Sequence, residues 1–146
     1  MTRVPKSQQN AIKLQLMRQV AEGLEFANEH NICHRDIKDD NLMVRVTKTE
    51  AHAQIIDLNI SKKAENDQSV FASLKYTPMF SAPEQESGKV YSFPVDWFSF
   101  GVVLFKLFTG IFPYMSLTDK TKLIRVPPFV QIELAELMRC YLQADP

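Results

Sequence analysis

The chain has 146 residues, of which 45% are hydrophobic, and this is enough for one compact domain with its own core. Its 17 lysines and arginines balance its 17 aspartates and glutamates, so we expect neither nucleic acid nor an anionic membrane as a partner. The four glycines are too widely spaced for the G-x-G-x-x-G or G-x-x-x-x-G-K-S/T loops that hold phosphates. Composition therefore predicts a single domain over residues 1–146 that lacks a glycine-rich phosphate loop.

The cysteines and the first residues bear on the cellular compartment. Cys33 and Cys140 form no C-x-x-C pair and do not cluster with the histidines, so the pattern favours two buried free thiols over a zinc site or a disulfide. Residues 1–10 are polar and basic and lack the apolar stretch of a secretory signal. We therefore expect a soluble, intracellular protein of the cytoplasm.

A first amphipathic helix is predicted over residues 7–30. Apolar side chains recur there at every fourth position and form one stripe that packs on a core. They are Ile12, Leu16, Val20 and Leu24. After a polar and charged stretch, residues 42–46 and 53–57 have the composition of strands with a polar turn between them, which predicts a small β-hairpin.

The second half of the chain alternates between irregular and helical patterns. Residues 58–86 show no apolar period, and a long irregular segment in a compact domain is typical of a regulated loop. Residues 96–109 are apolar on almost every side, which predicts a helix in the middle of the core that is too short to cross a bilayer. Gly110 is placed to end this helix, and a last helix is predicted over residues 130–142. The chain as a whole has the pattern of an α+β fold that is mainly α-helical.

Residues with chemical character gather after the first helix. Residues 34–41 read H-R-D-I-K-D-D-N, and residues 57–59 read D-L-N. This pattern resembles the protein kinase family, whose catalytic loop reads H-R-D-x-K-x-x-N and whose metal-binding motif reads D-F-G. Residues 76–84 (Y-T-P-M-F-S-A-P-E) are similar to the end of that family's activation segment, and residues 96–101 (D-W-F-S-F-G) to its D-V-W-S-x-G motif.

The resemblance extends from about residue 8 to residue 146, because residues 140–146 are similar to the family's C-L-x-x-D-P motif. It corresponds to one part of the family's fold. We therefore expect the C-terminal lobe of the protein-kinase fold, an α+β structure that is mainly α-helical and carries a small β-hairpin.

The resemblance implies a protein serine/threonine kinase, which transfers a phosphoryl group from ATP to a protein hydroxyl. Asp36 would orient the attacking hydroxyl and accept its proton, and Lys38 would place a cation near the transferring phosphate. Thr77 would contact both residues and help to seat the protein substrate. A lysine two positions after the catalytic aspartate is the serine/threonine pattern of the family, which favours Ser or Thr over Tyr as acceptor.

The same resemblance implies ATP and Mg²⁺ as cofactors and indicates which residues bind them. Asn41 and Asp57 would hold Mg²⁺, which prefers hard oxygen donors. Lys38, Asn41 and Asp57 would also contact ATP, and Met43 would form part of the floor under the nucleotide.

Three residues carry the family's regulatory pattern. Arg35 and Lys62 would be the two cations that hold a phosphorylated activation segment. Ser73, nine residues before Ala82, stands at the family's usual phosphorylation position. Two interpretations of Ser73 remain open, a phosphorylation site that orders the segment and an ordinary loop serine.

Four further residues are predicted to be structural rather than chemical. By the resemblance, His34 would pack with Leu58 in a hydrophobic spine. Asp96 would anchor the catalytic loop by hydrogen bonds to its backbone, and Glu84 would form a structural ion pair.

One departure from the family pattern bears on activity. About seven residues precede the first helix, where the family has an N-terminal lobe with a glycine-rich loop and a phosphate-binding lysine. The chain on its own is therefore expected to transfer phosphate near background, and an N-terminal lobe or a partner protein is expected to cover its top face. The alternative is a noncatalytic, pseudokinase-like module that binds proteins.

Overall fold

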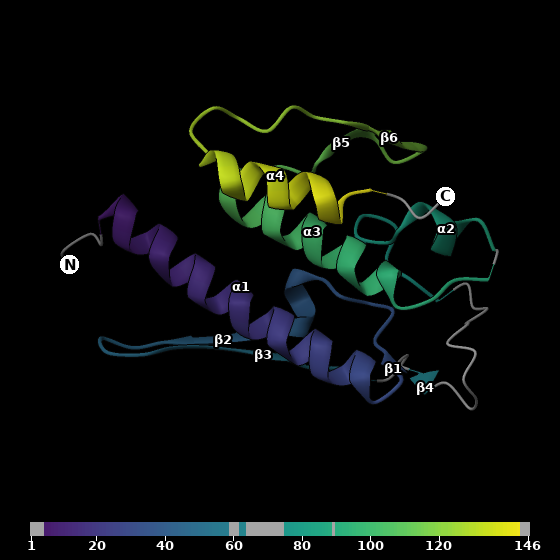
Figure 1. Cartoon of the computed structure of the whole chain (residues 1–146), viewed down its shortest axis with the longest axis horizontal. Helices are drawn as coiled ribbons and strands as arrows, with labels where there is room; N and C mark the ends of the chain where they lie inside the picture. The colour runs from purple at the N-terminus through teal and green to yellow at the C-terminus, as the bar shows by residue number, and fades with distance from the viewer. Residues whose placement is uncertain (1–4, 59–61, 64–74, 89, 144–146) are drawn as a thin grey trace.

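The computed structural model describes residues 5–58, 62–63, 75–88 and 90–143. Its helices are α1 (Lys6–Glu29), α2 (Pro83–Glu86), α3 (Pro94–Thr109) and α4 (Ile132–Tyr141), with one 3₁₀ turn, η1 (Asp39–Asn41). Its strands are β1 (Ile32–Cys33), β2 (Leu42–Val46), β3 (Ala51–Ile55), β4 (Lys62–Lys63), β5 (Tyr114–Ser116) and β6 (Asp119–Leu123). The strands pair as three antiparallel ribbons, β1–β4, β2–β3 and β5–β6 (Figure 1). The predicted α+β class, mainly helical with a small hairpin, is confirmed.

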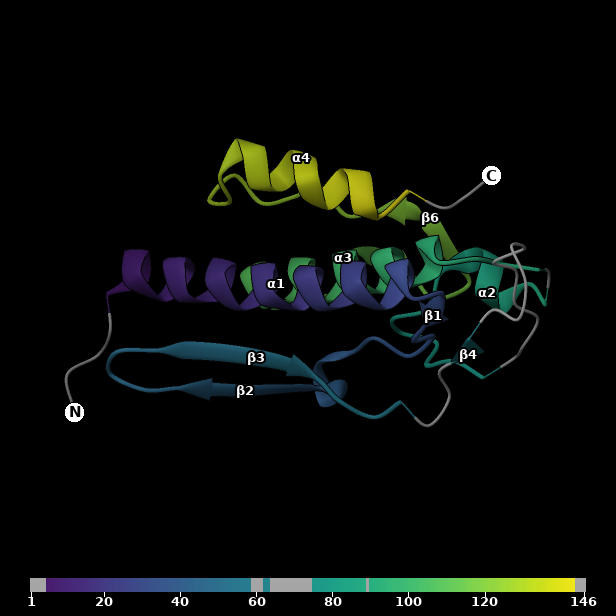
Figure 2. The same ribbon diagram turned by 60° about the horizontal axis from the view of Figure 1, so that its bottom comes forward.

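Helix α3 forms the centre of the core, as its apolar sequence predicts. Ten of its residues, all between Val95 and Phe105, are buried. Figure 2 shows α1 and α3 in a middle layer, with α4 on one side and the β2–β3 ribbon on the other. Gly110 ends α3 in the left-handed conformation at φ 80°, and its N–H donates to the carbonyl oxygen of Lys106 at 2.8 Å. The predicted helix stop is therefore confirmed.

The contact between α3 and α4 depends on a glycine. A Cβ atom at Gly101 would lie 2.6 Å from the Cβ of Tyr141 and 3.3 Å from its backbone carbonyl carbon. Around this close approach, the Tyr141 ring stacks on Trp97 with ring centroids 5.7 Å apart and meets Phe100 edge-on at 5.1 Å. Any side chain at position 101 would therefore push α4 away from α3.

We expect Gly101→Ala to lower the free energy of unfolding by about 1–2 kcal/mol, because the overpacking cost exceeds the gain in helix propensity. The matched control is Gly23→Ala in α1, where a Cβ would meet only the flexible tip of the Ile55 side chain, at 3.3 Å from Cδ1. This control should be neutral or stabilising by up to about 1 kcal/mol. Urea unfolding of both variants measures the difference, and equal midpoints would contradict the expectation.

The β2–β3 hairpin differs from its prediction by two residues. The second strand covers Ala51–Ile55 rather than residues 53–57. Three hydrogen bonds explain the shift. The backbone N–H of Thr47 closes the turn on the carbonyl oxygen of Glu50 at 2.8 Å, and the Gln19 side chain of α1 donates to the carbonyl oxygen of Ala51 and accepts from the N–H of Ala53. Helix α1 therefore determines where β3 begins.

Three other expectations need correction. Residues 83–86 were predicted to be irregular but form α2, because Pro83 stands at the first helical position, where a proline is favoured. Residues 114–123, for which no element was predicted, form the β5–β6 ribbon. Cys33 is buried as predicted, but Cys140 is exposed, because α4 turns Leu134, Ala135 and Met138 toward the core instead.

No helix in the described ranges is long and apolar enough to span a membrane.

Candidate active site

The loop between β1 and η1 is held in place by a buried carboxylate at the start of α3. The backbone N–H groups of His34 and Arg35 donate to the two carboxylate oxygens of Asp96, each at 2.7 Å. Asp96 is fully buried, and this burial raises the pKa of its carboxyl above the usual range, although the two N–H groups act in the opposite direction. Arg35, the residue before Asp36, adopts the left-handed backbone conformation at φ 70°.

Asp36 lies at the centre of a hydrogen-bonded cluster. Thr77 Oγ1 donates to Asp36 Oδ1 at 2.5 Å, and Lys38 Nζ contacts both Asp36 Oδ2 at 2.8 Å and Thr77 Oγ1 at 3.0 Å. Asn41 Nδ2 donates to Asp36 Oδ2 at 3.1 Å and to the Asp36 carbonyl oxygen at 2.8 Å. The structure thus brings together all four residues predicted to be catalytic, although Thr77 is 41 positions from Asp36 in the chain.

These donors decide the charge of Asp36. Burial acts to raise the pKa of its carboxyl, but the hydrogen bonds from Lys38, Thr77 and Asn41 and the Lys38 charge outweigh it, so the pKa lies below its usual range. Asp36 is therefore ionised at neutral pH and can accept a proton.

The two predicted magnesium ligands lie on neighbouring segments at one end of the β2–β3 ribbon. The backbone N–H of Ile56 donates to the Asn41 carbonyl oxygen at 2.9 Å, which places Ile56, the residue before Asp57, opposite Asn41. Asp57 is exposed and left-handed at φ 63°. Because Asn41 Nδ2 is used on Asp36, its Oδ1 is the atom available to a cation.

An amide oxygen and a carboxylate fit Mg²⁺, which prefers hard oxygen donors. In the described ranges, no group of three or more His, Cys, Asp or Glu side chains is arranged to hold a metal ion. Met43, the residue predicted under the nucleotide, is 58% exposed on β2, next in the chain to Leu42.

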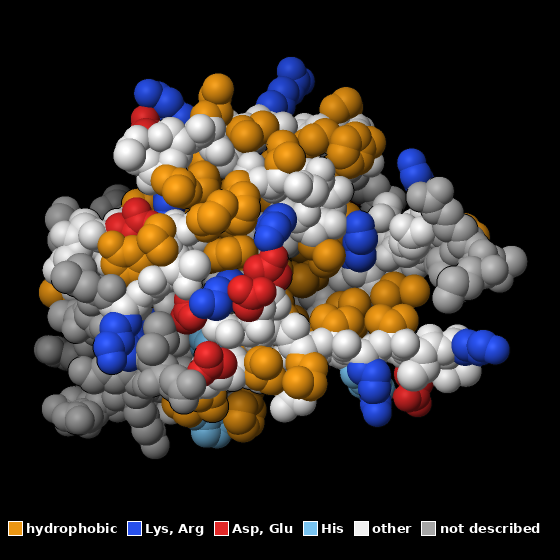
Figure 3. Space-filling view, turned by 180° about the vertical axis from the view of Figure 1, so that it is seen from behind, with side chains coloured by type: hydrophobic (Ala, Val, Ile, Leu, Met, Phe, Trp, Pro, Cys, Tyr) orange, Lys and Arg blue, Asp and Glu red, His pale blue; other side chains and the backbone are white. Residues whose placement is uncertain are grey.

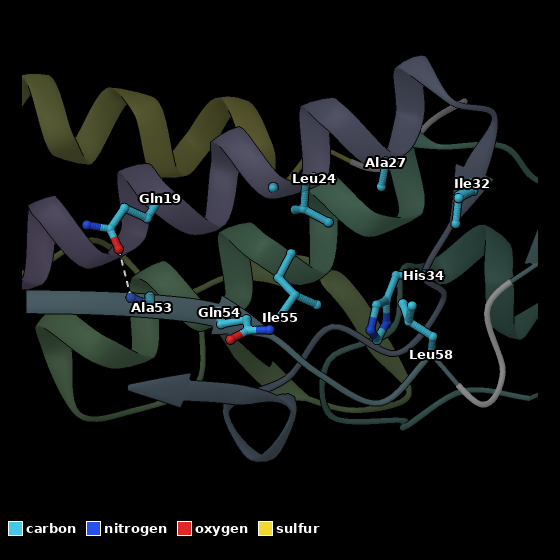
Figure 4. A pocket seen from close by; sticks show the side chains of 10 residues that line it. Gln19, Leu24, Ala27, Ile32, His34, Ala53, Gln54, Ile55 and Leu58 are labelled. Atoms are coloured by element: carbon cyan, nitrogen blue, oxygen red, sulfur yellow. Dashed lines mark hydrogen bonds between the residues drawn. The ribbon is translucent and has the colours of Figure 1, made fainter. Parts of the chain in front are cut away.

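His34 is buried and lies beside a cavity. Its Nε2 makes a hydrogen bond with the carbonyl oxygen of Ile56 at 3.1 Å. The cavity, of about 290 Å³, lies between α1 and β3, and His34 and Leu58 line one end of it (Figure 4). Its other walls are largely apolar, with Leu24 and Ala27 from α1 and Ile55 from β3.

The predicted regulatory residues are only partly within the described ranges. Arg35 is buried next to Asp36. The backbone of Lys62 pairs with Cys33 in the β1–β4 ribbon. The side chain of Lys62 and all of Ser73 lie outside the described part of the chain. Glu84 lies on α2 and is half-buried.

A second ion pair flanks the site. Lys106 Nζ pairs with the carboxylate of Asp39 and lies 5.4 Å and 5.0 Å from the ring centroids of Phe80 and Phe112. Figure 3 shows acidic and basic side chains adjoining near the middle of the face seen from behind, with hydrophobic side chains around them. Charges of opposite sign therefore lie next to one another on this surface.

Comparison with known proteins agrees with this geometry. The family model described as "Protein kinase domain" matches residues 3–141. The chain belongs to the protein kinase domain family.

Among curated proteins, this kinase domain is 27% identical over 142 residues to "Protein kinase C zeta type" of Oryctolagus cuniculus. It is 30% identical over 136 residues to "Protein kinase C, eye isozyme" of Drosophila melanogaster, and 29% identical over 134 residues to "Serine/threonine-protein kinase N2" of Danio rerio. These alignments cover 87–88% of the chain but only 13–24% of the relatives. The chain therefore spans less than a quarter of the length of these relatives.

Sequence reasoning missed two buried polar residues of this kinase domain. Gln85 of α2 is fully buried, and its Nε2 donates to the carbonyl oxygen of Arg35 at 2.9 Å. Lys120 of β6 is also buried and pairs with Glu86. Gln85 directly follows the A-P-E motif, and this proximity was the one signal that could have identified it. Nothing near Lys120 in the sequence indicates burial.

Proposed function

We propose that the chain is the catalytic C-terminal lobe of a protein serine/threonine kinase that uses ATP and Mg²⁺, organised as a single domain over residues 1–146. The observation that carries the proposal is the Asp36 carboxylate, ionised and held by Lys38, Thr77 and Asn41. An enzyme that phosphorylates hydroxyl groups needs such a carboxylate to orient the hydroxyl and accept its proton.

In the proposed reaction, the hydroxyl of a substrate serine or threonine lies against Asp36. Its oxygen forms a bond to the terminal phosphorus of ATP, the bond from that phosphorus to the leaving oxygen of ADP breaks, and the hydroxyl proton passes to Asp36. The Lys38 ammonium lies beside the phosphoryl group during its transfer and stabilises the negative charge of that group. Thr77 forms hydrogen bonds with both Asp36 and Lys38 and keeps the two side chains next to each other.

Asn41 Oδ1 and the Asp57 carboxylate would hold Mg²⁺, and the ion would neutralise phosphate charge. Lys38, Asn41 and Asp57 would contact the nucleotide, and Met43 would form part of the floor under it. Arg35 and Lys62 would be the cations that hold a phosphorylated Ser73. Asp96 anchors the loop by its hydrogen bonds to the backbone, while His34 would pack with Leu58 and Glu84 would form a structural ion pair.

A covering partner completes the proposal. Apolar side chains are exposed on both faces of β2, because successive residues of a strand point to opposite sides. Met43 is 58% exposed on one face, Val44 and Val46 are 51% and 50% exposed on the other, and Leu58 at the end of the cavity is 62% exposed. Exposed apolar groups of this kind mark an interaction surface. We assign this exposed part of the β2–β3 ribbon to an N-terminal kinase lobe or to a partner protein that takes its place, and the substrate is a second protein partner.

The same exposed apolar side chains support the second candidate function, a noncatalytic protein-binding module, and one substitution separates the two. Asp57→Ala in the protein at its native length should remove phosphoryl transfer to a protein substrate, measured with radiolabelled ATP and Mg²⁺. The bound partners, recovered by affinity purification, should stay the same. If the wild-type protein transfers phosphate only at background and Asp57→Ala keeps the same bound partners, the binding module is the correct interpretation.

A further inference from the structure

A lysine on β6 is buried beneath the active-site segment. The Lys120 side chain is 1% exposed, and Lys120 is the one lysine among the buried residues of the described ranges. Its ammonium contacts the carbonyl oxygens of Pro78 and Ser81 and the hydroxyl of Ser81, and it forms an ion pair with Glu86. The Ser81 contacts measure 2.7 Å to the carbonyl oxygen and 3.2 Å to Oγ. A lysine has three donors, so these oxygens account for its whole hydrogen-bonding capacity.

The oxygens that Lys120 binds belong to the turn that carries Thr77. The N–H groups of Phe80 and Ser81 donate to the Thr77 carbonyl oxygen at 2.9 Å and 3.0 Å, and this closes the turn. From β5, the hydroxyl of Tyr114 donates to the carbonyl oxygen of Met79 in the same turn. The β5–β6 ribbon therefore holds the turn through a side chain from each strand.

Helix α2 connects the same lysine to the catalytic loop. Glu86, at one end of α2, pairs with Lys120, and Ser81 Oγ donates to the same Glu86 carboxylate oxygen. The neighbouring Gln85 donates to the carbonyl oxygen of Arg35, the residue before Asp36. Lys120 thus bonds directly to the turn that carries Thr77, and it is connected to the loop that carries Asp36 through Glu86 and Gln85 of α2.

We propose that Lys120 is a positioning residue for phosphoryl transfer, which fixes the turn at residues 77–81 and helix α2 so that Thr77 stays bonded to Asp36. The effect of Lys120 on phosphoryl transfer rests on the proposed function. Removing Lys120 would leave the carbonyl oxygens of Pro78 and Ser81 without their shared donor, and the Glu86 side chain, which is 25% exposed, without its counter-charge, so these segments should loosen.

The first test needs no activity and follows amide hydrogen exchange in the chain by NMR. Lys120→Met should raise the exchange rates of the Phe80 and Ser81 amides at least about tenfold, while the Val102 and Val103 amides in the core of α3 stay within about threefold. The matched control is Lys122→Met on the same strand, because Lys122 is 76% exposed and pairs only at the surface with Asp119. This control should leave all four amides unchanged.

A second variant keeps the test decisive if Lys120→Met does not fold. Glu86→Gln preserves the shape of the side chain and removes its charge, so the same two amides should exchange faster than in Lys122→Met. Lys120→Arg restores the positive charge and should recover part of the protection. Equal exchange at Phe80 and Ser81 in Glu86→Gln and Lys122→Met would overturn the proposal.

The last measurement separates positioning from stability in the protein at its native length. Lys120→Met should lower kcat about tenfold or more and leave the KM for ATP within about twofold, and Lys120→Arg should recover part of kcat. A kcat equal to that of Lys122→Met would overturn the positioning role while phosphoryl transfer itself persists. If wild type shows no phosphoryl transfer but the exchange result holds, the proposed function fails and the anchoring of Thr77 by Lys120 stands.

Discussion

Asp36→Asn should lower kcat for phosphoryl transfer by about 10²–10⁴-fold in the protein at its native length. The amide keeps the size of the carboxylate but cannot accept the hydroxyl proton. It also turns an acceptor into a donor within a group that already contains three donors, Thr77 Oγ1, Lys38 Nζ and Asn41 Nδ2. Steady-state kinetics with ATP, Mg²⁺ and a serine-containing protein substrate measures the effect.

The control for this experiment is Asp40→Asn, which removes a carboxylate four positions away. Asp40 is exposed, so its loss should leave kcat within about twofold of wild type. If the two variants lost activity to the same extent, Asp36 would not be the proton acceptor.

Asp96→Ala should lower the free energy of unfolding by about 2–4 kcal/mol. The substitution leaves the buried N–H groups of His34 and Arg35 without their acceptor, and each such group costs about 1–3 kcal/mol. Part of this cost is offset, because a fully buried carboxyl with a raised pKa is itself costly to ionise. Urea unfolding gives the total, and amide exchange at His34 and Arg35 should increase with it.

Ser99→Ala is the matched control on the same helix. Ser99 is buried, but its hydroxyl bonds only to the carbonyl oxygen of Val95 one turn earlier, at 3.0 Å. Its loss should cost less than about 1.5 kcal/mol and leave the catalytic loop in place. Equal destabilisation by the two substitutions would contradict the anchoring role of Asp96.

The architecture explains why so few residues can organise this site. Asp96 at the start of α3 holds the catalytic loop from below, and Gln85 of α2 holds the same loop at the carbonyl oxygen of Arg35. Since α3 is the most deeply buried helix, its first turn provides a rigid base for Asp36. Asp36 and the residues that bond to it thus lie at the edge of a core that supports them.

Periodicity predicted the helices well because a buried helical face requires apolar residues at regular spacing. The helix predicted over residues 7–30 corresponds to α1 at Lys6–Glu29, and the one over residues 130–142 to α4 at Ile132–Tyr141. The short elements were less predictable. The β5–β6 ribbon consists largely of polar residues, and even its apolar Met115 is exposed, as is Thr121. No alternation of buried apolar and exposed polar residues therefore marks it in the sequence.

The central helix, the H-R-D-x-K-x-x-N loop and the family could be predicted from the sequence, because they depend on residues close together in the chain. The resemblance to the family also predicted the contact of Thr77 with Asp36 across 41 positions. The contacts of Lys120 with Ser81 across 39 positions and of Gln85 with Arg35 across 50 became known from the folded structure alone. A single polar residue carries no mark of its partner, because burial and pairing arise only when separate segments pack together.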